Sequence, residues 1–151
     1  MTTVRETALQ ALFATVENAV RGFADAPMLE RNTTEPQVIP PDGLIIMRDG
    51  SAEEPEMTIG RSREYHWQHR AQLSIIVQHD VEEIRRTLAD QLLMAVSDQI
   101  EIDNSLGTTG VSVVCRAGAP EITHERNEGA APLIVVDLPV HIDFVSERPV
   151  G

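Results

Sequence analysis

The clearest pattern in the chain is an alternation of apolar and polar positions from residue 65 to residue 78. One set of alternate positions is largely apolar and holds Tyr65, Trp67, His69, Ala71, Leu73, Ile75 and Val77. The positions between them are largely polar and hold His66, Gln68, Arg70, Gln72, Ser74, Ile76 and Gln78. Successive side chains of a strand point to opposite faces, so this pattern predicts an unusually long strand with one face on the core and the other in water.

Two other segments have the spacing of amphipathic helices. The first covers residues 3–24, and Thr3 followed by Glu6 is a capping-box pattern. Its apolar stripe consists of Leu9, Leu12, Phe13, Val16, Val20 and Phe23. The second helix runs from Asp80, as N-cap with Glu83 at the third helical position, to about Ile102. Its stripe consists of Val81, Ile84, Leu88, Leu92, Ala95, Val96 and Ile100.

Shorter strands are predicted on either side of the second helix. Residues 44–60 are expected to form a hairpin, with an acidic tip at 49–56 that carries Glu53 and Glu54. Residues 111–117 are a further strand, and residues 121–147 are a hairpin that turns near 127–129. Pro139 cannot donate to a ladder, so the second arm of that hairpin is expected at an edge or with a bulge. The four prolines of residues 25–43 predict a long extended connection, of a kind often ordered at interfaces.

These elements predict a single α+β domain over residues 1–151. The order is a helix, three strands, a helix and three strands, so two long helices should pack on one face of a mostly antiparallel sheet of about five to six strands. The candidate core is Leu12, Val16, Trp67, Leu73, Ile75, Leu88, Leu92, Val113, Cys115, Val136 and Val140.

Charge narrows the possible partners. The net charge is −12, and all 12 basic residues are arginine. A surface this acidic should not hold nucleic-acid phosphates or anionic membranes. It indicates either simple solubility or a surface that DNA passes without being bound. The sequence shows no secretory signal, no apolar run long enough to span a membrane, and a single cysteine that excludes an intrachain disulfide.

The candidate chemistry is weak at each position. His66 and His69 form an H-x-x-H pair, but on a strand they point to opposite faces, so no metal site is expected. Cys115 could be combined with His124 or His141 as a nucleophile and base, although its apolar neighbours favour a buried, inert thiol. There is no phosphate-binding glycine motif and no lysine. No cofactor and no catalytic activity are therefore predicted.

The order and spacing of several segments resemble those of a known family. They are "RETALQALFATVENAV", "PQVIPPDGLIIMRDG", "YHWQHRAQLSIIVQ", "RRTLADQLLMAVSDQI", "DNSLGTTGV" and "GAAPLIVVDLPVHIDFVSE". Together they resemble the tail terminator (tail completion) proteins of long-tailed bacteriophages, the minor tail protein U-like group. The resemblance implies a structural virion protein, assembled in the host cytoplasm, that forms a hexameric ring on the last ring of the tail tube. The ring would stop tube polymerisation and meet the head-completion or neck proteins, and DNA would pass through it without specific binding.

The predicted contact surface for a neighbouring subunit or the tube consists of Glu53, Glu54, His66, Gln68, Arg70 and Gln72. These side chains either face solvent or contact a partner, and we favour contact with a partner. Three other functions stay open. They are another neck (head–tail joining) protein, a small transferase that uses Cys115, and a binding module with a pocket between helices and sheet.

Overall fold

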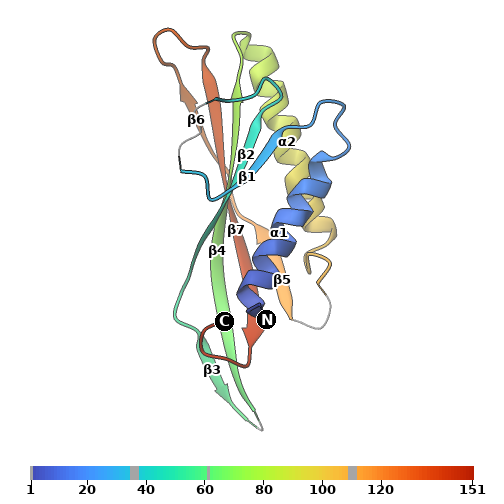
Figure 1. The fold of residues 1–151 in the computed structure, drawn as a ribbon, viewed down its shortest axis with the longest axis vertical. Helices are drawn as coiled ribbons and strands as arrows, with labels where there is room; N and C mark the ends of the chain where they lie inside the picture. The colour runs from blue at the N-terminus through green and yellow to red at the C-terminus, as the bar shows by residue number, and fades with distance from the viewer. Residues whose placement is uncertain (1, 35–37, 61, 109–111) are drawn as a thin grey trace.

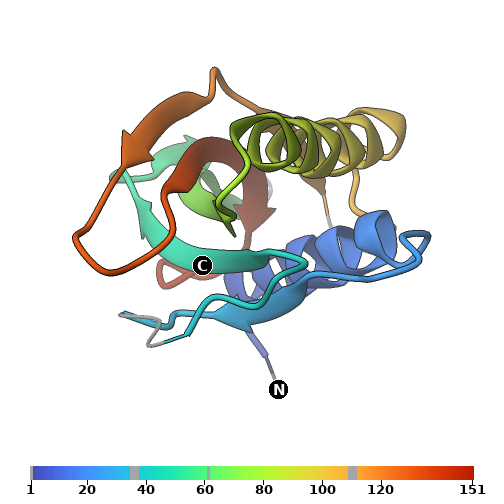
Figure 2. The same ribbon diagram turned by 90° about the horizontal axis from the view of Figure 1, so that it is seen from above.

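A computed structural model describes residues 2–34, 38–60, 62–108 and 112–151 (Figure 1). Along these residues the elements are α1 (Val4–Val20), β1 (Met28–Arg31), β2 (Leu44–Ala52), β3 (Glu56–Ile59), β4 (Arg63–Gln78), α2 (Glu82–Ile102), β5 (Val113–Ala117), β6 (Glu121–Glu125) and β7 (Leu133–Ser146). Both helices lie on the same side of the sheet (Figure 2). The predicted α+β fold is confirmed, but in the described part of the chain the sheet has seven strands rather than five or six.

The two longest strands, β4 and β7, form the middle of the sheet. They run antiparallel and pair without interruption from Tyr65–Ser146 to Gln78–Leu133. On one side β2 and β3 follow one another along β4, with β1 outside β2. On the other side β6 and β5 follow one another along β7. All the described strand pairs are antiparallel except β1 with β2, which are parallel.

The helix-facing side of the sheet carries the main core. Ten residues predicted for the core are buried, namely Leu12, Val16, Trp67, Leu73, Ile75, Leu92, Val113, Cys115, Val136 and Val140. Leu88 is only partly buried, and Ile84 is exposed, because the buried stripe of α2 begins at Arg85 and Ala89 instead. The first turn of α2 is thus rotated away from the predicted stripe.

The opposite face of the sheet is also covered at one end. Leu44, Ile46 and Ile76 are buried there, and Ile39 packs against them from the segment before β2. The prediction of one wet face along the whole of β4 is therefore wrong for its C-terminal half. From residue 67 to residue 72 the alternation holds, with Trp67 and Ala71 buried and Gln68 and Arg70 exposed.

The helix starts differ from one another. The Oγ1 of Thr3 accepts a hydrogen bond from the Glu6 amide at 3.1 Å, which confirms Thr3 as the N-cap of α1. The predicted cap at Asp80 is wrong, because α2 begins one residue later with Val81 as N-cap and no side-chain capping bond. The Val81 amide donates instead to Nδ1 of His79 at 2.9 Å.

The predicted hairpin over residues 44–60 is wrong. β2 and β3 both pair with β4, one after the other, so residues 49–56 run beside β4 instead of forming a tip. The Asp49-Gly50 turn signal marks a bulge between Arg48 and Ser51. Gly50 has a φ of +68°, and a Cβ there would overlap the carbonyl oxygen of Arg70. The hairpin in this region is formed by β3 and β4.

Two proline positions also differ from expectation. Pro139 lies in a central strand without a bulge, at the point where the neighbour of β7 changes from β6 to β5. Its carbonyl accepts from the Gly118 amide at 2.8 Å on that side. The amide and carbonyl of one antiparallel strand residue point the same way, so the missing N–H falls at this gap and the β4–β7 ladder stays intact.

The proline-rich segment 25–43 is not only a connection, because Met28–Arg31 form β1 within it. Residues 35–37 of that segment, and residue 111 of the predicted strand 111–117, lie outside the described residues. The predicted hairpin at the end of the chain is confirmed as β6 and β7, which pair from Glu121–Asp137 to Glu125–Leu133.

Candidate interface

The open part of the sheet face lies opposite the helices, along the N-terminal half of β4. Gln68 and Arg70 are exposed there, and His66 and Gln72 are half-buried. Their partners across β7 are Val145, Asp143, His141 and Pro139 in turn. Because β4 pairs with β7 without a bulge over this stretch, the four predicted contact residues form one row on one surface. This row, His66–Gln68–Arg70–Gln72, is called the polar row below.

Glu53 and Glu54 lie beside this row rather than at a distant tip. The Glu53 amide donates to the carbonyl of Gln68 at 3.1 Å, which holds the acidic segment against β4. Glu53 and Glu54 line a shallow depression of about 290 Å³ together with Glu56, His66, Gln68, Val114 and Asp143. The structure thus brings together four of the six predicted contact residues, while Arg70 and Gln72 lie further along the strand.

A buried polar chain ends the open face at Gln72. Nη1 of Arg48 donates to Oγ of Ser74 at 2.6 Å, and that hydroxyl donates to Oδ1 of Asp137 at 2.7 Å. Ser74 is only 2% exposed, so the chain of bonds is protected from water. It joins β2, β4 and β7 across the sheet. The sequence offered no signal for it beyond the polar parity of Ser74.

The two histidines of the H-x-x-H pair have separate environments. His66 faces the polar row, and its Nε2 lies 3.4 Å from Oγ1 of Thr58. His69 is buried on the helix side, where its Nε2 bonds to the carbonyl oxygen of Asp49. Burial lowers the pKa of His69, so the ring is neutral and Nε2 carries the donated proton. Among the described residues, no group of three His, Cys, Asp or Glu side chains is placed to hold a metal ion.

Cys115 is enclosed in the core. It is 2% exposed, and burial raises the pKa of its thiol to about 12. His141 pairs with Arg116, the next residue, and therefore points to the opposite face of the sheet. His124 pairs with Ile134, eight residues along β7 from the partner of Cys115, which is about 26 Å at strand rise. Neither histidine is placed to act as a base for this thiol.

A charged triad that the sequence did not reveal joins α1, β1 and β2. Arg31 donates two hydrogen bonds to Glu6, at 3.0 and 3.1 Å, and two to Asp49, at 2.8 and 3.0 Å. The Arg31 hydrogen bond lowers the pKa of Glu6. Burial raises the pKa of Asp49, but hydrogen bonds from Arg31 and Asn32 outweigh it and leave that pKa lowered. The triad is a structural clamp at the start of α1.

Trp67 belongs to the core at the lower end of the sheet. Its ring stacks on Phe144 with centroids 6.0 Å apart, and the Arg5 guanidinium lies 4.9 Å above it. Its Nε1 donates to Oγ of Ser146 at 2.9 Å. These contacts account for every polar and apolar part of the indole, so Trp67 acts as a structural anchor beneath the polar row.

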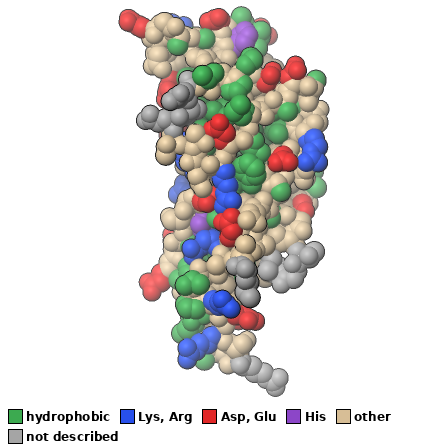
Figure 3. Space-filling model, in the orientation of Figure 1, with side chains coloured by type: hydrophobic (Ala, Val, Ile, Leu, Met, Phe, Trp, Pro, Cys, Tyr) green, Lys and Arg blue, Asp and Glu red, His purple; other side chains and the backbone are tan. Residues whose placement is uncertain are grey.

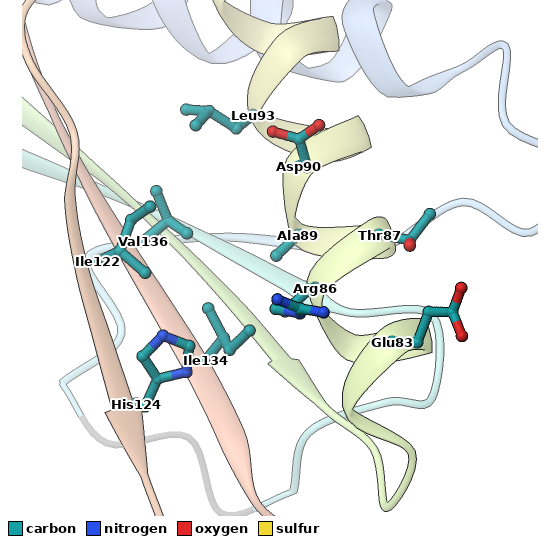
Figure 4. Close-up of a pocket in the computed structure, with 10 residues that line it drawn as sticks. All are labelled: Glu83, Arg86, Thr87, Ala89, Asp90, Leu93, Ile122, His124, Ile134 and Val136. Atoms are coloured by element: carbon teal, nitrogen blue, oxygen red, sulfur yellow. The ribbon is translucent and has the colours of Figure 1, made fainter.

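A groove separates α2 from the outer strand β6 (Figure 4). Its volume is about 510 Å³, and it is lined by Glu83, Arg86, Thr87, Ala89, Asp90, Leu93, Ile122, His124, Ile134 and Val136. Ile134 and Val136 form the buried floor, and Ile122 is 56% exposed on the β6 wall. In Figure 4 the aliphatic side chains of strand and helix point toward one another across it. The sequence predicted a pocket between helices and sheet only as one open possibility.

No described helix is long and apolar enough to cross a membrane. No protein-family model and no curated protein matches the sequence. Among the solved structures that the chain resembles is a protein chain from a structure described as "Virion of native gene transfer agent (GTA) particle", with 15% identity and a TM-score of 0.58. The match covers 96% of this chain and 100% of that chain. At this identity the likeness shows that the two chains share a fold over nearly their whole length.

Proposed function

We propose that this protein is a structural component of a phage-like virion, and specifically the tail terminator. It forms a ring on the end of the tail tube, stops further polymerisation and joins the tail to the head-completion or neck proteins. The observation that carries this proposal is the full-length structural likeness to a chain of a gene transfer agent virion. The order of segments along the sequence, which resembles the tail terminator family, supports the finer assignment.

The polar row and the neighbouring Glu53 and Glu54 are the proposed contact with the tube or an adjoining subunit. The face carries charges of both signs and is not covered by either helix. Polar faces of this kind suit contacts that form between already folded subunits, because the exposed residues remain soluble before assembly.

The acidic charge fits passage of DNA. Each copy carries −12, so a ring of several copies is strongly negative, and a negative channel wall repels phosphates instead of binding them. Electrostatic mapping of the assembled ring tests this part of the proposal. A neutral or basic channel would contradict it.

The proposed function is tested in particles that contain the Arg70→Glu variant. Arg70 is exposed at the centre of the polar row, so reversing its charge should disturb assembly without disturbing the core. We expect tails of abnormal length, or tails detached from heads, in electron micrographs. The matched control is Arg21→Glu at the C-cap of α1, where the side chain is 69% exposed and lies away from the sheet face.

Particles that lack this protein altogether provide the decisive comparison. Normal heads joined to tails of normal length in its absence would refute the terminator assignment. Detection of the protein bound to the portal side alone, with no contact to tube protein, would assign it to the neck instead. A six-fold ring of the purified protein in negative stain would support the ring.

A further inference from the structure

The β3–β4 hairpin projects past the rest of the sheet with an uncovered apolar face. β4 continues beyond its last β7 partner, the Tyr65–Ser146 pair, and only β3 pairs with it there in the described residues. Met57 lies opposite Tyr65, and Ile59 opposite Arg63, so these four side chains share the helix-facing side. Met57 is 49% and Ile59 is 81% exposed, because the helices do not extend over the hairpin (Figure 1).

The same end of the molecule shows hydrophobic and arginine side chains side by side in the space-filling view (Figure 3). Arg63 is exposed next to the apolar pair. An exposed apolar edge strand of this kind is a surface that proteins normally cover, because its backbone and side chains can both attract another chain. The hairpin therefore needs an occupant that is apolar where Met57 and Ile59 lie and acidic where Arg63 lies.

The groove between α2 and β6 has those properties. Ile122 on β6 and Leu93 on α2 both line it, above a floor of Ile134 and Val136. Asp90 lies on its helix wall and is exposed, and Glu83, also exposed, lies about two turns before it on the same helix. Arg86 also lines the groove, and its Nε lies 3.9 Å from a carboxylate oxygen of Glu82. The groove thus has an apolar floor, with Asp90 and Arg86 on its helix side and His124 on its β6 side.

The hairpin cannot reach the groove of its own chain. Ile122 aligns through Val136 with Ile75 of β4, which is twelve residues from Arg63. Twelve residues of strand extend about 40 Å, and β4 is a continuous strand between these points. The two surfaces lie toward opposite ends of the molecule (Figure 1).

We propose that the β3–β4 hairpin of one copy docks into the α2–β6 groove of the next copy. Met57 and Ile59 enter between Leu93 and Ile122, and Arg63 meets Asp90. The contact is heterologous, so each copy uses one hairpin and one groove, and the series closes into a ring when the rotation permits. The inference rests on the proposed ring, for which it supplies one contact between subunits.

Cysteine cross-linking tests the contact directly. Ile59→Cys and Ile122→Cys are made in separate full-length chains, mixed and oxidised with diamide; Cys115 is buried and remains in both as a common background. We expect a disulfide-linked pair in the mixture and none from either variant alone, since a heterologous contact never places two equal positions together. The control pair is Ile102→Cys with Met94→Cys, which are 80% and 55% exposed against 81% and 56% for the test pair.

A charge exchange provides the second measurement. Arg63→Glu should slow cross-linking about tenfold, and Asp90→Arg in the partner chain should restore it. The inference is overturned if the control pair cross-links as fast as the test pair, if Ile59→Cys links to itself, or if no mixed pair forms. If rings form on tails but the mixed disulfide does not form, only this contact is contradicted. If the mixed disulfide forms but particles lacking the protein still have normal tails, only the terminator function is contradicted.

Discussion

At the scale of single residues, Arg31 has the most consequential contacts outside the core. It bonds to carboxylates from α1 and β2 while lying in β1, with a side chain that is 25% exposed. Arg31→Met removes four charge-assisted bonds and should lower the free energy of unfolding by about 1–2 kcal/mol, measured by urea denaturation. Arg21→Met, which loses one exposed pair with Glu17, should change it by less than about 0.5 kcal/mol.

The same substitution should alter the dependence of stability on pH. The pKa values of Glu6 and Asp49 lie below their ordinary values of 4.5 and 3.8, so the folded chain binds fewer protons there than the unfolded chain. Stability from the triad is present above these ordinary values and is lost as the pH falls through the lowered ones. Wild type should therefore lose stability faster than Arg31→Met as the pH falls below about 5. Parallel curves for the two proteins would contradict this.

Cys115 offers a test of the enzymatic alternative at the same scale. Its thiol is enclosed, and burial raises its pKa to about 12, so very little thiolate exists at neutral or mildly alkaline pH. We expect no reaction with a chromogenic disulfide reagent at pH 8 in the folded protein, and one thiol released per chain after denaturation. Rapid reaction of the native protein would revive Cys115 as a candidate nucleophile.

At the scale of elements, a comparison of Gly50 in the bulge with Gly129 distinguishes strain from backbone conformation and strain from steric overlap. Gly50 and Gly129 both have a φ in the left-handed region, at +68° and +77°. A Cβ at Gly129 meets nothing within 4 Å, whereas one at Gly50 overlaps the Arg70 carbonyl. Gly129→Ala should cost about 1 kcal/mol, from backbone conformation alone, and Gly50→Ala should cost at least about 2 kcal/mol more. Equal thermal destabilisation of both variants would show that β2 does not approach β4 as closely as described.

The start of α2 predicts a stabilising substitution. Val81 occupies the N-cap with extended backbone angles and supplies no side-chain acceptor. Val81→Thr keeps the shape and adds one, so it should raise the free energy of unfolding by about 0.5–1 kcal/mol. Asp80→Ala should leave stability nearly unchanged, because Asp80 is not the cap. If Asp80→Ala destabilised the protein by about 1 kcal/mol, the predicted helix start would have been right after all.

Some features of these elements could be predicted from the sequence and others could not. The alternation in β7 and in the N-terminal half of β4, and the apolar stripe of α1, could be predicted because each has one buried face over many residues. The pairing of β3 was not readable, because Asp49-Gly50 serves a bulge as well as a turn and both need a positive φ at glycine. The rotation of α2 depends on burying Arg85, which bonds through Nη1 to the carbonyl of His79, and composition gives no sign of that.

At the scale of the whole molecule, the candidate interface followed from strand parity, but the groove did not. The polar row was visible as alternate positions of one strand, so its residues could be named in advance. The α2–β6 groove combines helix and strand residues that are at least 29 positions apart, and it exists only because β6 folds back along β7. Local sequence patterns carry no information on such a combination, since it depends on topology.

The net charge of each copy should make assembly depend on salt concentration. Copies that each carry −12 repel one another at long range, whereas the proposed contact between Arg63 and Asp90 acts at close range. Salt weakens the long-range repulsion between copies more than it weakens the Arg63–Asp90 contact. The screening length falls from about 30 Å at 0.01 M to about 10 Å at 0.1 M, whereas a desolvated ion pair is screened much less. Assembly of the purified protein, followed by analytical ultracentrifugation, should therefore increase from low to moderate salt. The doubly substituted pair Arg63→Glu with Asp90→Arg should retain that increase, because it preserves the net charge. Assembly that weakens steadily with added salt would mean that attraction between charged surfaces, rather than an apolar contact working against repulsion, holds the copies together.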